Sequence, residues 1–159
     1  MTPVSAERDT EKTLTMKTLL LLAVIVAFGP LRVHGGLLHL GEMIALMTGK
    51  EVVTTYAFYG CYCGLGGEGS PVDETDWCCA DHDCCYTRLE KLGCGTKFLS
   101  YRFNYNGSEI TCENQDACKN QLCDCDKNLS YCLARNKETY NDTYRFYPTD
   151  KCSGSSLPC

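Results

Sequence analysis

The sequence lacks an apolar run long enough to cross a bilayer, and it lacks an excess of positive charge. The longest apolar stretch, Leu19 to Phe28, falls short of the roughly 20 residues that a membrane-spanning helix needs. The chain has 15 Lys and Arg against 20 Asp and Glu, and this acidic balance disfavours a general nucleic-acid-binding protein. Internal repeats, low-complexity tracts and linkers are missing too. A hydrophobic content of 44% nevertheless excludes a disordered chain, so we expect one folded domain.

The apolar stretch near the N-terminus has the surroundings of a secretory signal peptide. Lys17 places a positive charge before it, and small residues follow it. We predict a signal peptide over residues 16–35, cleaved after Gly35, and hence a secreted, extracellular protein. A buried helix is the alternative interpretation. Residues 1–15 are a polar upstream extension, and because signal peptides normally begin at the initiator, we expect translation to start at Met16.

Cysteine is abundant, and all 14 cysteines follow the predicted cleavage site. An even number of cysteines in a secreted chain predicts seven disulfides. A zinc–thiolate interpretation needs reduced thiols, which does not suit a secreted protein. The predicted mature domain, residues 36–159, has 11 Lys and Arg against 17 Asp and Glu, so it is more acidic than the whole chain. We expect this domain to be a monomer.

The patterning predicts a mainly α, disulfide-rich fold with a small β-hairpin. Residues 37–47 have apolar side chains at helical spacing, which suits either core packing or the wall of an apolar channel. Residues 73–92 and 114–138 predict two long helices. Residues 97–112 alternate as in a hairpin. Residues 60–71 are too rich in glycine for a helix or a regular strand, and the C-terminal remainder reads as extended loop.

Two of the predicted helices carry cysteines seven residues apart, which places each pair on one helix face. Antiparallel helices would allow Cys78 to join Cys132 and Cys85 to join Cys125 in a single register. His82 lies between the two cross-links in the sequence. The spacing therefore predicts that His82 lies at the seam between the helices, although 14 cysteines allow on the order of 10⁵ pairings.

The same register brings Asp126 of the second helix within about one turn of His82. A neutral imidazole is a natural general base near neutral pH, and a carboxylate can fix its tautomer. Asp83 follows His82, and the glycine-rich loop 59–67 has little side-chain bulk, so its carbonyl oxygens can converge on a hard cation such as Ca²⁺. Each feature alone is more often a surface pair or a turn. Together they predict hydrolysis by an activated water.

These segments resemble a known family. Residues 59–67 (YGCYCGLGG), 76–86 (DWCCADHDCCY) and 123–127 (CDCDK), with the spaced Cys132, resemble the secreted phospholipases A2. A tail that ends in cysteine and a first helix without cysteine resemble group II, near the IIA type. The resemblance implies hydrolysis of the sn-2 ester of glycerophospholipids at a membrane surface, with Ca²⁺ as cofactor.

The resemblance also implies a role for each matching residue. The implied catalytic groups are His82 as general base, Asp126 as its orienting partner and the Gly64 N–H at the oxyanion. The implied supporting residues are Tyr86 and Tyr101, the implied Ca²⁺ ligands are Asp83 and the carbonyls of Tyr62, Gly64 and Gly66, and the implied acyl channel is Leu37, Leu40 and Ile44. The family pairing implies five further disulfides: Cys61–Cys152, Cys63–Cys79, Cys84–Cys159, Cys94–Cys118 and Cys112–Cys123.

The chain departs from the resemblance in its charge. Relatives of the IIA type are strongly cationic and favour anionic membranes, whereas this mature domain is acidic, with Glu68 in the predicted calcium loop. We therefore expect weak binding to anionic vesicles. A catalytically weak, receptor-binding or toxin-like module on the same fold is the alternative function. A cystine-rich growth-factor-like domain would not explain the histidine, the aspartates and the loop. Sequons at Asn106, Asn128 and Asn141 are candidate glycosylation sites.

Overall fold

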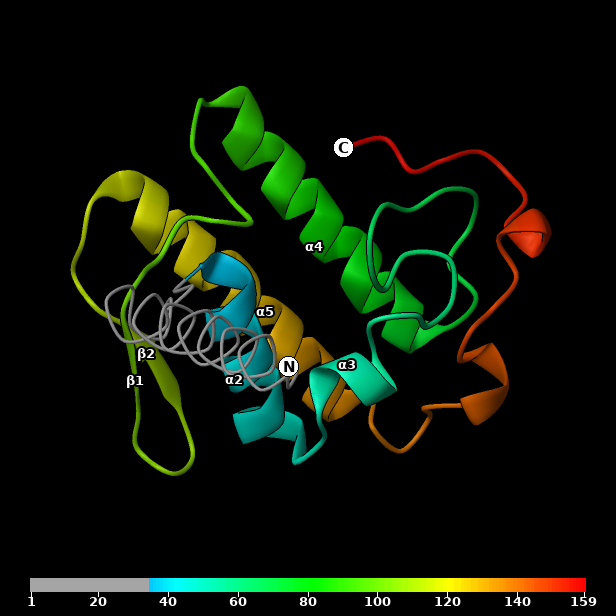
Figure 1. Cartoon of the computed structure of the whole chain (residues 1–159), viewed down its shortest axis with the longest axis horizontal. Coiled ribbons are helices and arrows are strands. Elements are labelled where there is room, and N and C mark those ends of the chain that lie inside the picture. Colours follow the sequence, from blue (N-terminus) through cyan, green and yellow to red (C-terminus); the bar gives the residue numbers. More distant parts are fainter. Residues whose placement is uncertain (1–34) are drawn as a thin grey trace, which may run out of the picture. The chain divides into compact units, whose positions relative to one another are not determined.

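The computed structural model describes residues 35–159, which are organised around two long helices (Figure 1). The predicted signal peptide and upstream extension lie outside the described residues, apart from Gly35. The predicted fold class, mainly helical with seven disulfides and one small hairpin, is confirmed. In chain order the elements are α2 (Gly36–Thr48), α3 (Val52–Thr55), α4 (Glu74–Lys91), β1 (Phe103–Tyr105), β2 (Ile110–Cys112), α5 (Ala117–Arg135) and the 3₁₀ turns η1 (Asp142–Tyr144) and η2 (Thr149–Lys151).

Each of the two long helices begins at an aspartate cap. The Asp73 side chain accepts a hydrogen bond from the Asp76 N–H at the start of α4, and the Asp116 side chain accepts one from the Lys119 N–H at the start of α5. These caps satisfy backbone donors that have no partner within the helix. Helix α4 also has acidic residues in its first turn and basic residues in its last turn, which suits the helix dipole.

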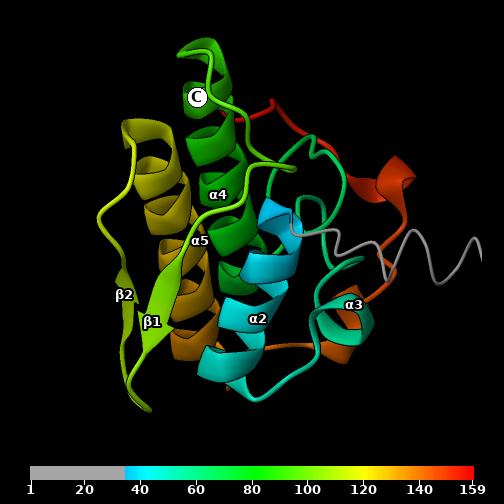
Figure 2. The ribbon, with the colours of Figure 1, turned by 60° about the vertical axis from the view of Figure 1, so that its left-hand side comes forward.

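Helices α4 and α5 lie side by side, with α2 next to them (Figure 2). The disulfides Cys78–Cys132 and Cys85–Cys125 join α4 to α5, with Cα–Cα distances of 5.7 and 5.9 Å. The antiparallel register predicted from the cysteine spacing is therefore present. The remaining pairs are Cys61–Cys152, Cys63–Cys79, Cys84–Cys159, Cys94–Cys118 and Cys112–Cys123, the same partners that the family resemblance implies.

The apolar stripe of α2 is mostly part of the core. Met43 and Ile44 are almost fully buried, and Leu40 is 9% exposed, whereas Leu37 is 44% exposed. Leu40 and Ile44 belong to one apolar cluster, and Met43 belongs to a second cluster that contains aromatic side chains of α4 and of the chain after it. Helix α2 thus fixes the position of α4 and α5 from one side.

Three local features differ from the sequence prediction. The hairpin is shorter, because residues 97–102 form no strand and β1 and β2 have three residues each, paired with Phe103 opposite Cys112. The short helix α3 was not predicted. The C-terminal remainder, predicted as extended loop, contains the single turns η1 and η2. Disulfides to Cys152 and Cys159 tether this remainder, so it can hold turns that have no periodic sequence pattern.

Candidate active site

His82 on α4 and Asp126 on α5 form a buried pair between the long helices. The His82 Nε2 and Asp126 Oδ1 atoms are 2.7 Å apart, and the two side chains are 8% and 0% exposed. The pair exists because both residues lie in the helix seam between the two disulfides. The structure therefore brings together the two groups that the sequence pattern selects.

Two tyrosine hydroxyls hold the Asp126 carboxylate. Tyr86 Oη donates to Asp126 Oδ1 at 2.8 Å, and Tyr101 Oη donates to Oδ2 at 2.6 Å. Burial raises the pKa of both tyrosines, and the neighbouring Asp126 raises it further, so both remain donors at neutral pH. Asp126 is thus a fully buried carboxylate whose two oxygens both accept hydrogen bonds.

This network determines which imidazole nitrogen can act as a base. An ionised carboxylate only accepts hydrogen bonds, so the Nε2 atom of His82 carries the proton that points at Asp126. The neutral ring then has its lone pair on Nδ1. A base with a fixed tautomer is the arrangement that water activation requires.

Asp83, the next residue on α4, lines a cavity that His82 does not line. This cavity has a volume of about 260 Å³, and Asp83 lines it together with Tyr62 and Gly66 of the glycine-rich loop. Burial raises the pKa of Asp83, and the nearby His82 and Lys97 partly oppose that rise. No hydrogen bond between described residues ends on the Asp83 carboxylate, which leaves its oxygens free for a ligand.

The donor groups around Asp83 fit a calcium ion. No hydrogen bond between described residues ends on the carbonyl oxygens of Tyr62, Gly64 or Gly66, which are the three carbonyls implied by the family resemblance. Within residues 35–159 no cluster of three or more His, Cys, Asp or Glu side chains could hold a metal. A site that combines one carboxylate with backbone carbonyls and water suits Ca²⁺, which takes six to eight oxygen ligands.

Gly64 lies where the chain has no room for a side chain. Its φ is +141°, and a Cβ atom there would lie 2.4 Å from the Ala57 carbonyl oxygen. Any other residue would push the loop away from Ala57, and with it the Gly64 N–H that the resemblance assigns to the oxyanion. The glycine pattern therefore has a physical cause at this position.

Asp76 anchors the glycine-rich loop, a role that the sequence analysis missed. Its fully buried carboxylate accepts backbone N–H bonds from Cys61 at 2.7 Å, Tyr62 at 2.8 Å, Cys63 at 3.3 Å and Val72 at 3.0 Å. No local signal marked it, because Asp76 follows Glu74 in the acidic first turn of α4. An acid in the first turn of a helix is ordinarily explained by the helix dipole.

We expect Asp76→Asn to lower the free energy of unfolding by about 3 kcal/mol, because a neutral amide replaces a buried carboxylate on which four backbone donors depend. Denaturant unfolding with intact disulfides measures the change. Asp124→Asn, the same substitution at an exposed position on α5, is the control and should stay close to the parent. Equal stability of the two variants would contradict the anchoring role.

Lys97 is the second residue that the sequence analysis missed. It lines the same cavity as Asp83 and is the one Lys or Arg among the described residues that line it. Nothing in its sequence neighbourhood marks it, because it lies in an irregular segment between α4 and β1. Its ammonium places a positive charge in the cavity that the Asp83 carboxylate lines.

The acyl-channel residues are only partly brought together. Leu40 and Ile44 belong to the apolar cluster that also contains Cys79 of α4 and Leu129 of α5. Leu37 is exposed at the start of α2. Leu37, Leu40 and Ile44 line neither the cavity of His82 nor the cavity of Asp83. The acyl channel therefore remains a prediction.

Comparisons with known proteins identify the class to which this site belongs. The sequence model of the phospholipase A2 family matches residues 37–145. "Phospholipase A2, membrane associated" of Homo sapiens is 60% identical over 144 residues, covering 91% of this chain and 100% of that protein. "Phospholipase A2 group V" of Homo sapiens is 49% identical over 138 residues, covering 87% of this chain and 100% of that protein. "Group IIE secretory phospholipase A2" of Mus musculus is 47% identical over 144 residues, covering 91% of this chain and 100% of that protein.

The chain belongs to the phospholipase A2 family, and it is an enzyme that hydrolyses phospholipids. Within that family it is of the secreted, group II type. None of the helices in residues 35–159 is long and apolar enough to cross a membrane.

Proposed function

We propose that this enzyme is a secreted, Ca²⁺-dependent phospholipase that hydrolyses the sn-2 ester of glycerophospholipids at a membrane surface, and that it acts as a monomer. The observation that carries the proposal is the 2.7 Å contact between His82 Nε2 and Asp126 Oδ1, held by two tyrosine hydroxyls. This geometry supports a neutral imidazole with its lone pair on Nδ1, beside a carboxylate that fits Ca²⁺ in the next residue.

In the proposed reaction, His82 Nδ1 takes a proton from a water molecule as that water attacks the sn-2 carbonyl carbon. Asp126 stabilises the imidazolium that forms. The bond from the carbonyl carbon to the glycerol oxygen then breaks, and the glycerol oxygen takes the proton from His82. The products are a fatty acid and a lysophospholipid. When bound, Ca²⁺ would supply positive charge next to the developing oxyanion. The Gly64 N–H is proposed to donate a hydrogen bond to that oxyanion.

Fatty-acid release from mixed phospholipid vesicles by the secreted protein tests this function. We expect release with millimolar Ca²⁺ and none with chelator, and we expect labelled fatty acid to come from the sn-2 position. Correctly cross-linked protein that binds Ca²⁺ but releases no fatty acid would favour the receptor-binding module. N-terminal sequencing of the secreted form tests cleavage after Gly35.

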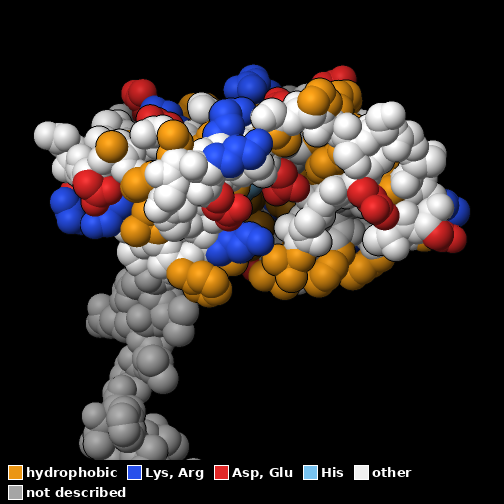
Figure 3. All heavy atoms as spheres, turned by 90° about the horizontal axis from the view of Figure 1, so that it is seen from above, with side chains coloured by type: hydrophobic (Ala, Val, Ile, Leu, Met, Phe, Trp, Pro, Cys, Tyr) orange, Lys and Arg blue, Asp and Glu red, His pale blue; other side chains and the backbone are white. Residues whose placement is uncertain are grey.

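The surface charge predicts the membrane preference. Apolar side chains gather along one edge of the molecule (Figure 3), and the exposed large apolar residues include Leu37, Leu38, Phe58 and Phe146. The Phe58 and Phe146 rings stack with centroids 5.8 Å apart. Because the mature domain is acidic, we propose that adsorption depends on these apolar side chains more than on cationic side chains.

We therefore expect binding to anionic vesicles in physiological salt to be no tighter than binding to zwitterionic vesicles, because net negative charge repels an anionic surface. Vesicle sedimentation measures both affinities. Glu68→Lys, which reverses an exposed charge directly after the glycine-rich loop, should shift the preference toward anionic vesicles. Tight anionic binding by the unmodified protein would refute the prediction.

A further inference from the structure

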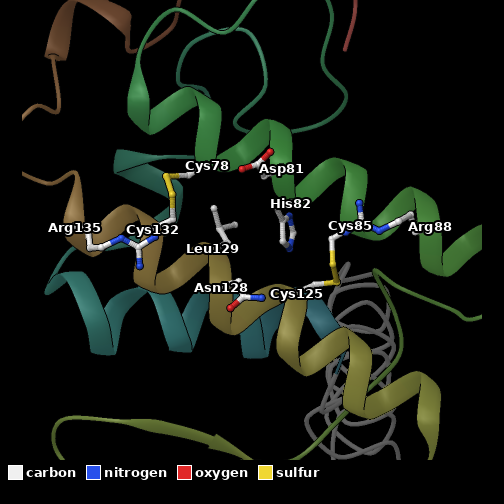
Figure 4. A pocket seen from close by; sticks show the side chains of 10 residues that line it. All are labelled: Cys78, Asp81, His82, Cys85, Arg88, Cys125, Asn128, Leu129, Cys132 and Arg135. Atoms are coloured by element: carbon white, nitrogen blue, oxygen red, sulfur yellow. A yellow bond between two sulfur atoms is a disulfide. The ribbon is translucent and has the colours of Figure 1, made fainter. Parts of the chain in front are cut away.

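The two disulfides between α4 and α5 frame an opening in the helix pair. A cavity of about 300 Å³ lies between Cys78–Cys132 and Cys85–Cys125 (Figure 4). All of its lining residues come from these two helices, and besides the four cysteines they are His82 and Leu129, with Asp81, Arg88, Asn128 and Arg135. The imidazole of His82 lies between the two disulfides in this view.

The cavity has a buried floor and a polar rim. His82 and Leu129 form the floor, at 8% and 6% exposed. The rim residues Asp81, Arg88, Asn128 and Arg135 are exposed, and no ion pair between described residues includes them. Polar groups without protein partners are hydrated, and a cavity of this size holds several water molecules. The opening therefore brings solvent to the wall formed by His82.

No residue of helix α2 lines this opening. In Figure 4 the labelled lining side chains extend from α4 and α5 into the space between the two helices. The exposed apolar residues Leu37 and Leu38 are on α2, and none of the large exposed apolar residues lines the cavity. The exposed apolar side chains that would rest on lipid are therefore separate from the rim of the cavity.

We propose that the cavity between α4 and α5 is a water portal, which supplies water to His82 while the enzyme sits on a membrane. The inference rests on the proposed function, in which each turnover consumes one water molecule at His82. On a vesicle, the exposed apolar side chains of α2 would rest on lipid, and an acyl chain would fill the channel predicted beside α2, so that side would exclude water. The portal offers a second approach to the same imidazole.

The competing explanation is that the cavity is only a gap between helices that the disulfides hold apart. The two explanations differ in what a plug would do. If the portal supplies water, closing it should slow turnover only where lipid blocks the other approach. If the cavity is a structural gap, closing it should leave the turnover of vesicles and of dispersed substrate unchanged, or should lower both through distortion of His82.

Asn128→Trp is the test variant, because it adds bulk at the rim from α5. Asn128→Gln is its matched control, since it also removes the Asn-Leu-Ser sequon but adds little bulk. Asp81→Trp plugs the opposite rim from α4 and replaces the first variant if that variant does not fold. Each protein is assayed with zwitterionic vesicles and with a short-chain phospholipid dispersed as monomers, and vesicle affinity is measured by sedimentation.

We expect Asn128→Trp to lower turnover on vesicles by about tenfold, with unchanged vesicle affinity and unchanged turnover of the dispersed substrate. Asn128→Gln should match the parent on both. Equal rates for parent and plugged variants on vesicles, or equal losses on both substrates, would overturn the portal. Failure of the proposed function is distinguishable, because the parent protein itself would then release no fatty acid from either substrate.

Discussion

His82→Gln is expected to lower Ca²⁺-dependent fatty-acid release by roughly 10²–10⁴-fold, the usual contribution of a general base. Glutamine can keep a hydrogen bond to Asp126, but its amide cannot take a proton from water at neutral pH. Initial rates of release from zwitterionic vesicles measure the change. The loss should appear in kcat, because vesicle binding depends on other residues.

The fold should survive this substitution. Asp126 keeps its bonds from Tyr86 and Tyr101, and the disulfides on either side of position 82 hold the helices in register. His39→Gln is the matched control, because His39 is the other histidine in residues 35–159 and packs against the Tyr101 ring without touching Asp126. It should keep its rate within about tenfold of the parent.

A His82→Gln variant that releases fatty acid at the parental rate would remove His82 from the chemistry. The receptor-binding alternative would be favoured instead if the parent and both variants were equally inactive while still binding Ca²⁺. Circular dichroism and the mass of the fully oxidised chain separate these outcomes from simple misfolding.

The central part of the site was predictable because helix periodicity and covalent geometry determine it. Cysteines seven residues apart share a helix face, and two such pairs allow one antiparallel register. That register places His82 opposite Asp126, and the structure has the two nitrogen and oxygen atoms 2.7 Å apart. The helix bounds were close to those predicted, because caps and periodic apolar residues are local signals.

Other parts were not predictable, because they depend on long-range contacts. Asp76 binds backbone groups 13–15 residues earlier in the chain, and no local pattern distinguishes it from a helix-dipole acid. Lys97 reaches the Asp83 cavity from an irregular segment whose path follows the fold. The opening beside His82 requires the distance between two helices, which the sequence does not contain. The contact between His82 and Asp126 could thus be predicted from the sequence, whereas the loop anchor and the surrounding cavities could not.

The division of α4 into two faces also has consequences for function. His82 lines the cavity between the long helices, whereas Asp83 lines the cavity beside the glycine-rich loop. Consecutive helix residues point about 100° apart, so one helix presents the proposed base and the proposed metal ligand to two neighbouring cavities. A substitution at position 83 can therefore remove metal binding without disturbing the His82–Asp126 pair.

Asp83→Asn is expected to weaken Ca²⁺ binding by at least about 100-fold and to lower fatty-acid release in parallel, because the proposed site then has carbonyl ligands but no carboxylate. Titration calorimetry measures the affinity. Asp81→Asn is the matched control, because it removes the same charge two residues earlier from an exposed position. Equal affinities for the two variants would exclude Asp83 as a ligand.

The stability of the Ca²⁺-free protein gives an independent check on Asp83. Burial raises the pKa of its carboxyl group, so the ionised form destabilises the Ca²⁺-free fold at neutral pH, and stability is regained as pH falls through the raised pKa. Asp83→Asn removes that cost and should be at least as stable as the parent without Ca²⁺. Protonation competes with Ca²⁺, so the parent's affinity should start to fall at a higher pH than for an ordinary aspartate. The asparagine variant should lack this pH dependence, and a similar dependence in both proteins would place the titrating group elsewhere.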